Sequence, residues 1–376
     1  MLILPFALLI SVTWSFEGGS AGRVEPVGEG HVRIGAQGQK DQDGRNRQAN
    51  WYSFRVDGAR PGQPVTIDLV DLPGEYNYQP NRGAVNAETP AVWSEDGRSW
   101  RHVEDFTYDA GEPKMTLRIT PRGRRFWVAH TPPYTNRHLE GLWKDARRAF
   151  RRTEIGRSVE GRPLWLWTTG TGAKTIWLMF RQHSWETGSS WVGEGAVREL
   201  LRNAALRSAY TWKILPMADP DGVARGGVRF NRHGFDLNRN WDVNGVAKMP
   251  EITAQRQAIL AAGGGALFLS LHNTETAEYL EGPPVTEPAV RELAGRFYEA
   301  LVGRSSFAPT RPLSFAGPVA AGRMTVIHGL TRERAWPAFL MEQRISRQPK
   351  YGRRPLVEDR LRFGGELVKV MSEVLQ

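Results

Sequence analysis

The sequence predicts an α/β fold, with a mixed, mostly parallel sheet flanked by helices, preceded by a small antiparallel β-sandwich. Three observations support this prediction. Hydrophobic residues make up 40% and charged residues 24% of the chain, which is typical of a globular protein. A length of 376 residues suits two domains. Near Pro132 and Pro133 the pattern changes from short strands to strands that alternate with helices. We therefore expect domains at 12–132 and 133–376.

The sandwich is predicted from short stretches in which apolar and polar side chains alternate, as in strands with one solvated face. Such stretches occur at residues 51–56, 65–70 and 115–120. Residues 95–97 (EDG) lie between two apolar segments and predict a hairpin turn. Helical periodicity is nearly absent from this part of the chain, which favours an all-β domain.

Continuous apolar runs in the second domain predict fully buried strands. These runs are residues 176–180, 212–216, 266–271 and 338–341. Helices are predicted between and after them, at residues 141–152, 190–202, 287–302 and 357–374. The alternation of the two kinds of element predicts an α/β domain.

Residues 1–11 begin with a run of apolar side chains that ends at Ile10. This run is too short to span a bilayer and is interpreted as the remnant of a signal peptide, although no Lys or Arg precedes it. Export to the periplasm is therefore favoured over a cytoplasmic location. We expect no stable membrane insertion, because no other segment is apolar enough.

The charge and the cysteine content restrict the chemistry. The net charge is +10, but the Arg clusters are dispersed along the sequence, so no nucleic-acid partner is expected. The positive charge instead favours acidic substrates. The chain has no Cys, so any metal must be held by His, Asp or Glu. The sequence indicates no oligomeric state.

Chemically active side chains follow three of the predicted strands. His183 and Glu186 follow the strand at 176–180, and His272 directly follows the strand at 266–271. Ligands of open α/β sheets bind beyond the carboxyl ends of the strands, so these side chains are expected to converge. Two His and one Glu are an established zinc ligand set that leaves a fourth position for water.

Glu342 directly follows the strand at 338–341, so the same argument places it at this edge of the sheet. A second carboxylate beside a hydrolytic zinc site is needed to move protons, and Glu342 is positioned for that task.

A further segment, residues 234–241 (GFDLNRNW), carries polar side chains that suit a substrate clamp. Asn238 and Arg239 are expected to bind a carboxylate, because Arg pairs with carboxylates in a bidentate manner. Arg229 supplies a second cation that is suited to polarising a carbonyl group. Asp236 is expected to accept a hydrogen bond from a ligating His and so to fix its tautomer.

Together these stretches resemble the zinc carboxypeptidases of the M14 (funnelin) family, and most closely the cytosolic carboxypeptidase subfamily. The resemblance rests on residues 181–187 (RQHSWET), 216–222 (PMADPDG), 235–241 (FDLNRNW), 271–272 (LH) and 339–342 (FLME). Residues 50–54 (NWYSF) and 92–97 (VWSEDG) resemble the β-sandwich that precedes the catalytic domain in that subfamily. The resemblance implies a carboxypeptidase-like α/β domain.

The resemblance also implies a cofactor. It implies one zinc ion per chain, held by His183, Glu186 and His272, with Asp236 as the aspartate that supports a ligand.

For the substrate, the resemblance implies Arg229 as the cation that polarises the carbonyl group. It implies Asn238 and Arg239 as the residues that bind the terminal carboxylate. It implies Glu342 as the general base and then the general acid.

These residues predict a zinc-dependent metallocarboxypeptidase that removes C-terminal residues from peptides or proteins, with acidic residues such as glutamate as the expected targets. Three alternatives are open at this point. One is an exported peptidase that trims cell-wall peptides, and the second is an N-acyl amino-acid deacylase with a similar zinc site. The third is a binding protein that has kept the fold without zinc.

Overall fold

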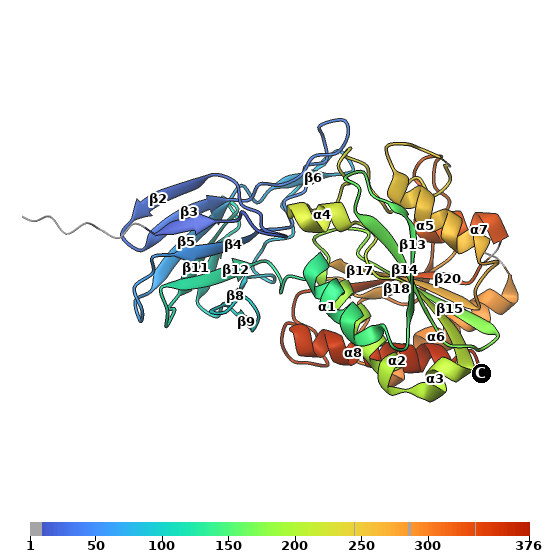
Figure 1. The fold of residues 1–376 in the computed structure, drawn as a ribbon. Helices are drawn as coiled ribbons and strands as arrows, with labels where there is room; N and C mark the ends of the chain where they lie inside the picture. Colours follow the sequence, from blue (N-terminus) through green and yellow to red (C-terminus); the bar gives the residue numbers. More distant parts are fainter. Residues whose placement is uncertain (1–9, 244, 285–286, 335) are drawn as a thin grey trace, which may run out of the picture. The chain divides into compact units, whose positions relative to one another are not determined.

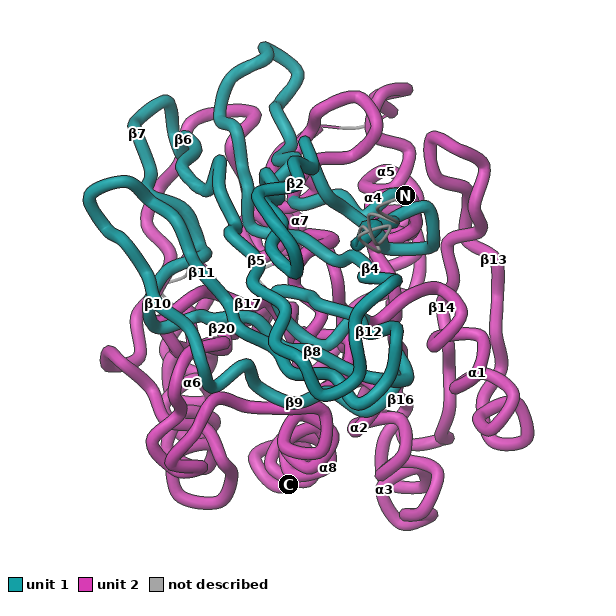
Figure 2. The backbone as a smooth tube through the Cα atoms, turned by 90° about the vertical axis from the view of Figure 1, so that its left-hand side faces the viewer, with its two compact units in different colours: residues 1–133, 225–228 teal, residues 134–224, 229–376 magenta. Residues whose placement is uncertain are grey.

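The computed structural model describes residues 10–243, 245–284, 287–334 and 336–376 (Figure 1). The chain divides into two compact units, which Figure 2 colours separately. Unit 1 contains residues 1–133 and 225–228, and unit 2 contains residues 134–224 and 229–376. Residues 1–9 of the apolar segment expected at residues 1–11 lie outside the described residues. No helix in the described ranges has both the length and the apolar character to cross a membrane.

Unit 1 is built from two five-stranded sheets. The first has the strand order β1-β4-β12-β8-β9 and the second has the order β10-β11-β5-β3-β2. Strands β6 and β7 form a separate two-stranded hairpin. The bounds are β1 Ser11–Thr13, β2 Val24–Gly28, β3 His31–Gly35, β4 Ser53–Asp57, β5 Val65–Val70, β6 Gly74–Tyr76, β7 Gln79–Asn81, β8 Val92–Ser94, β9 Arg101–His102, β10 Phe106–Asp109, β11 Lys114–Ile119 and β12 Arg125–Ala129.

A single apolar core lies between the two sheets, which confirms the predicted sandwich. Strand β5 contributes Val65, Ile67 and Leu69, whereas the other sheet contributes Phe54 and Phe126, among other buried residues. The period of two between the buried residues of β5 is the alternation expected of a strand with one solvated face. One pairing differs from the antiparallel prediction, because β3 runs parallel to β5.

Unit 2 contains an eight-stranded sheet with the order β13-β14-β16-β15-β17-β20-β18-β19. The central strands β16, β15, β17 and β20 are parallel, and β13, β14 and β18 pair with antiparallel neighbours. This is the mixed sheet that the sequence predicts. The bounds are β13 Arg151–Arg157, β14 Pro163–Thr169, β15 Lys174–Phe180, β16 Tyr210–Leu215, β17 Leu267–Thr274, β18 Tyr279–Gly282, β19 Ser314–Phe315 and β20 Ala338–Arg344.

Helices cover both faces of this sheet (Figure 1). Helices α1, α2, α6 and α8 pack in one apolar core with one face of the sheet, and α5 and α7 pack in a second core with the other face. The bounds are α1 Asn136–Ala146, α2 Thr187–Arg202, α3 Ala204–Ala209, α4 Pro220–Arg225, α5 Pro250–Ala261, α6 Pro288–Arg304, α7 Val326–Arg334 and α8 Val357–Glu373.

The helix predicted at residues 141–152 is wrong at both ends. Helix α1 begins at Asn136 and ends at Ala146, and residues from Arg151 onward form β13. The antiparallel pairing of β13 with β14 prevents the helix from continuing, because it commits these backbone groups to the sheet. The sequence did not predict α5, which has no clear polar stripe because it buries Glu251, Gln255 and Arg256 beside its apolar side chains.

Strands β17 and β20 run further than predicted, and this extension places two polar side chains on a defined face. Leu267, Leu269 and Leu271 of β17 belong to the core under α2 and α8. Side chains alternate along a strand, so His272 lies on the opposite face. Phe268, which is also on that face, belongs to the core that contains α5 and α7. By the same alternation, Glu342 of β20 lies on that face as well. His272 and Glu342 therefore lie within the last residues of their strands, and not after them.

Candidate metal centre and active site

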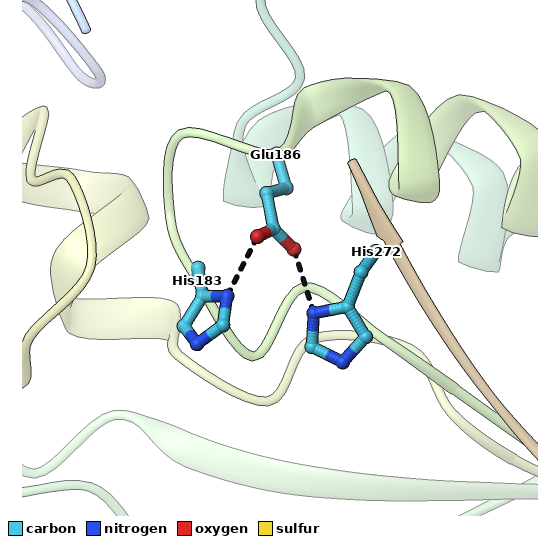
Figure 3. Close-up of side chains that lie close together, drawn as sticks. All are labelled: His183, Glu186 and His272. Carbon is cyan, nitrogen blue, oxygen red and sulfur yellow. Dashed lines mark hydrogen bonds and ion pairs between the residues drawn. The ribbon is translucent and has the colours of Figure 1, made fainter. Parts of the chain in front are cut away.

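The side chains of His183, Glu186 and His272 converge on one point of unit 2 (Figure 3). Each offers a ligand atom, and these atoms all lie within 4.8 Å of one another. His183 Nδ1 is 2.6 Å from Glu186 Oε1, and His272 Nδ1 is 2.9 Å from Glu186 Oε2. All three residues are buried. The three predicted ligands are thus close enough to share one ion.

The loop after β15 brings His183 and Glu186 to the same side. Glu186 directly precedes α2, and its backbone N–H donates to the His183 carbonyl at 3.2 Å. The beginning of α2 is fixed to the end of β17, because the Ser189 N–H donates to Asn273 Oδ1 at 2.9 Å. Gly188 permits this close approach, since a Cβ atom there would lie 2.8 Å from the same oxygen. Glu186 is consequently held beside His272, the neighbour of Asn273.

The outer nitrogen of each imidazole faces hydrogen-bond acceptors. His183 Nε2 lies 3.1 Å from Asp236 Oδ1. His272 Nε2 lies 3.1 Å from Gln182 Oε1 and 3.0 Å from Ser270 Oγ. These partners favour the tautomer with the proton on Nε2, which leaves the Nδ1 lone pairs pointing inward.

Two inward lone pairs and one carboxylate form a site of acceptors without a donor. Such a group suits a cation, and nitrogen and oxygen ligands in this combination suit zinc. The residues present therefore fit the metal that the sequence predicts.

The pKa values of two carboxyl groups at this site are lowered. Burial opposes the ionisation of Glu186, but the two imidazoles outweigh it and lower the pKa of its carboxyl to about 2. Burial also opposes the ionisation of Asp236, but Arg229, Arg239 and His183 outweigh it and hold its pKa well below the usual value. Both groups are therefore negative, as partners of a cation and of its ligands should be.

Glu342 is the direct Cα partner of His272 in the parallel pair of β17 and β20. The residue is partly exposed, but its Oε2 atom is buried and has no hydrogen-bond partner among the described residues. Desolvation and the negative charge of Glu186 raise the pKa of the Glu342 carboxyl well above its usual value. The site thus contains a carboxyl group with a raised pKa beside the predicted metal ligands, and such perturbed groups are typical of functional sites.

Arg229 lies beside the predicted ligand His183, with Asp236 between them. Its Nε atom donates to Asp236 Oδ2 at 2.8 Å, while Asp236 Oδ1 faces His183. A bridge between Phe230 and Asp236 closes the turn that connects Arg229 to this aspartate. The guanidinium group is mostly buried and partly opposes the rise of the Glu342 pKa, so its charge acts inside the site.

Asn238 and Arg239 follow Asp236 in the same turn. The Asn238 Oδ1 atom accepts the Val326 N–H at the beginning of α7 at 2.9 Å. This contact fixes the amide so that Nδ2 points toward His272, whose Nε2 is 3.5 Å away. Arg239 donates to the Asn238 carbonyl and is partly exposed. The turn therefore holds two donors beside the predicted metal site.

Several residues at the site were not expected from the sequence. Tyr279 of β18 is opposite Glu342 in the antiparallel pair with β20, and the Arg311 guanidinium lies 3.6 Å from the centroid of the Tyr279 ring. Ser270 was detectable, because it precedes His272 by two residues and so shares its face of the strand. The sequence carries no such signal for Gln182 or Arg311, since both lie outside the helices and strands.

Models of two sequence families match the chain. The zinc carboxypeptidase (peptidase M14) model matches residues 135–277, and the model of the cytosolic carboxypeptidase N-terminal domain matches residues 12–130. The first match includes His183, Glu186 and His272. Glu342 lies beyond its last residue.

Individual relatives are similar at a lower level. An uncharacterised protein of Zymomonas mobilis is 28% identical over 313 residues, which are 78% of this chain and 77% of that protein. Cytosolic carboxypeptidase 6 of Homo sapiens is 27% identical over 252 residues, which are 60% of this chain and 48% of the human protein. The chain thus spans about half the length of that human relative.

Solved structures share the fold. A metallo-carboxypeptidase from Burkholderia cenocepacia has a TM-score of 0.84 at 23% identity, with 97% of this chain and 98% of that chain covered. A metallo-carboxypeptidase from Pseudomonas aeruginosa, in complex with (2-guanidinoethylmercapto)succinic acid, has a TM-score of 0.85 at 23% identity, with 97% of this chain and 100% of that chain covered.

The fold and the two matched families define a metallocarboxypeptidase. Both matched segments occur in the order that the resemblance predicts, with the N-terminal domain before the zinc carboxypeptidase segment. Residues 135–277 therefore match the M14 family of zinc carboxypeptidases, and the chain resembles the cytosolic carboxypeptidase subfamily of that family.

Proposed function

We propose that this protein is a zinc-dependent exopeptidase that releases C-terminal residues from peptides or proteins. The observation that carries the proposal is the convergence of two Nδ1 atoms and one carboxylate, with both Nε2 atoms facing acceptors. His183, Glu186 and His272 would hold the zinc ion. When bound, zinc supplies Lewis acidity, which polarises a carbonyl group and lowers the pKa of water.

Glu342 moves the protons of the reaction. Its carboxylate accepts a proton from the attacking water and then gives that proton to the amine that leaves. The position of Glu342 opposite His272 supports this role, as does its buried Oε2 atom without a hydrogen-bond partner among the described residues. This oxygen keeps its capacity to accept a hydrogen bond from water.

Arg229, Asn238 and Arg239 bind the substrate. The Arg229 guanidinium stabilises the negative charge that develops on the carbonyl oxygen. Asn238 and Arg239 hold the free terminal carboxylate of the peptide, because both offer N–H donors and Arg239 adds a positive charge. A site that requires a terminal carboxylate restricts cleavage to the last peptide bond.

Acidic C-terminal residues, such as glutamate, are the proposed targets. The net charge of +10 supports this choice because it attracts acidic peptides. Arg311 supports it locally, since this half-exposed guanidinium stacks on Tyr279, the residue opposite Glu342. Glu281 works against it, since its carboxylate lies 3.8 Å from Arg311 and partly offsets that charge.

A peptide library that varies the C-terminal residue tests the function directly. Each peptide is offered with a free and with an amidated C-terminus to protein that was stripped of metal, and again after zinc is restored. Zinc-dependent release of single residues from free peptides, read by mass spectrometry, is the expected result. Equal cleavage of amidated peptides would contradict the carboxylate clamp. Hydrolysis of N-acyl amino acids alone would identify a deacylase.

A further inference from the structure

Gln182 lies directly before the predicted ligand His183 and has no role in the proposed reaction. Its side chain is buried, with 1% of the residue exposed. Both ends of its amide group are occupied. Nε2 donates to the Leu237 carbonyl at 2.9 Å, and Oε1 faces His272 Nε2 at 3.1 Å. Gln182 therefore connects two segments that both contribute to the active site.

The hydrogen bonds around His272 Nε2 define which atom carries each proton. The Ser270 hydroxyl donates its single hydrogen to Gln182 Oε1 at 2.8 Å, so toward His272 this hydroxyl acts as an acceptor. Gln182 Oε1 is an acceptor in every state of the amide. Because Gln182 Nε2 donates to Leu237, the amide is held in the orientation that turns Oε1 toward the imidazole. These two acceptors lie closer to His272 Nε2, at 3.1 and 3.0 Å, than the Asn238 Nδ2 donor does, at 3.5 Å. His272 Nε2 therefore carries the hydrogen, and Nδ1 keeps its lone pair for an ion.

The second end of Gln182 reaches the substrate clamp. Leu237 lies between Asp236 and Asn238, and its carbonyl also accepts the Trp241 Nε1–H at 2.9 Å. Two buried donors thus hold the backbone of the turn from which Asp236 faces His183 and Asn238 points toward His272. A loss of Gln182 would release one of these two contacts and one acceptor of His272 at the same time.

We infer that Gln182 is a positioning residue, which fixes the tautomer of His272 and holds the clamp turn against the metal site. This inference rests on the proposed zinc site. It predicts that replacement of Gln182 weakens metal binding although Gln182 touches neither the ion nor the substrate. Partners of this kind typically change metal affinity by about 10- to 100-fold.

The dissociation constant for zinc, measured by competition with a chromophoric chelator on the full chain, tests this inference. Gln182→Met removes the acceptor and the donor at similar volume, and we expect it to weaken zinc binding about 10- to 100-fold. Gln182→Glu keeps an acceptor toward His272, and we expect it to bind zinc more tightly than Gln182→Met. Gln255→Met is the matched control, because Gln255 is also buried and donates to a backbone carbonyl, that of Ala218.

Unfolding of each variant in urea separates metal affinity from stability. We expect Gln182→Met and Gln255→Met to lose similar stability, while only the first loses zinc affinity. Wild-type affinity in Gln182→Met would overturn the inference, and so would equal losses in Gln182→Met and Gln182→Glu. If Gln182→Met does not fold, Ser270→Ala replaces it, with a measurable loss of zinc affinity expected and unchanged affinity contradicting the inference. A wild-type chain that binds no zinc would instead overturn the proposed function itself.

Discussion

His272 on β17 and Glu342 on β20 are direct partners across two neighbouring parallel strands. The register of this single pair places a predicted metal ligand and the predicted proton carrier on the same face of the sheet. A slip of one residue would move Glu342 to the opposite face, into the core under α2 and α8. Correct pairing of β17 with β20 is therefore a condition for both metal binding and proton transfer in the proposed reaction.

Glu342→Gln is the most specific test of the proton carrier. The amide has nearly the same shape as the carboxyl but accepts no proton from water, so we expect kcat to fall by about 10²- to 10⁴-fold. Zinc content should stay at about one ion per chain, because Glu342 is not among the predicted ligands. Near-normal turnover in a zinc-loaded variant would show that Glu342 has a different role.

Arg239→Ala tests the carboxylate clamp. A hydrogen bond to a charged group contributes about 1.5–3 kcal/mol, so we expect KM for peptides with a free C-terminus to rise roughly 10- to 150-fold. Amidated peptides should be poor substrates for both the wild type and the variant. An unchanged KM for free peptides would exclude Arg239 from the clamp.

Asp236→Asn tests the support of His183. Asp236 Oδ1 faces His183 Nε2 and Oδ2 accepts from Arg229, so the amide removes a charged acceptor from both residues. We expect zinc affinity to fall about 10- to 100-fold. Asp242→Asn is a control on a nearby carboxylate, which accepts the Gly322 N–H instead. Equal zinc affinities of the two variants would argue against a supporting role for Asp236.

Arg311 and Glu281 test the proposed preference for acidic residues. Arg311 is half exposed, so its charge is screened, and Arg311→Ala should lower kcat/KM for peptides that end in glutamate by only about two- to fivefold. Glu281→Gln should raise the same constant, because it removes the opposing carboxylate. Peptides that end in leucine serve as the internal reference. Opposite changes, with lysine-terminated peptides preferred by the wild type, would reverse the proposed specificity.

A carboxylate in unit 1 predicts a pH dependence of stability that is separate from the active site. Asp68 is buried, and although burial raises its pKa, hydrogen bonds from Thr116 and His31 outweigh this effect and lower it. A lowered folded-state pKa stabilises the fold above the unfolded value of about 3.9, and this stabilisation is lost as the pH falls below it.

Hydrogen exchange of the β5 amides measures this local stability. At about pH 6, Asp68→Asn should be less stable than the wild type by about 1–2 kcal/mol, and the difference should shrink toward about pH 3. A difference that is constant over this range would show that the charge of Asp68 contributes no stability.

Much of this fold is predictable from hydrophobic patterns. The runs at 176–180 and 266–271 correspond to the central strands β15 and β17, because a strand buried on both faces is apolar throughout. Strand β13 was missed because Arg151 and its neighbours read as a basic helix. Its strand conformation depends on pairing with β14, and no local sequence pattern predicts this pairing.

The candidate site was likewise predictable only in part. His183, Glu186 and His272 were expected to converge because polar side chains at the ends of parallel strands meet at one edge of a sheet. The contacts of Gln182 and Asn238 were not predictable, because they depend on how the loop after β15 and the beginning of α7 pack against the turn at 236–239. No periodic pattern of residues in the sequence predicts such contacts between loops.

Crystals of the zinc-loaded protein, measured at the zinc absorption edge, test the central claim most directly. One anomalous peak is expected within about 2.0–2.2 Å of His183 Nδ1, His272 Nδ1 and a Glu186 carboxylate oxygen. A peak at any other position, or no peak among these three side chains, would contradict the central claim.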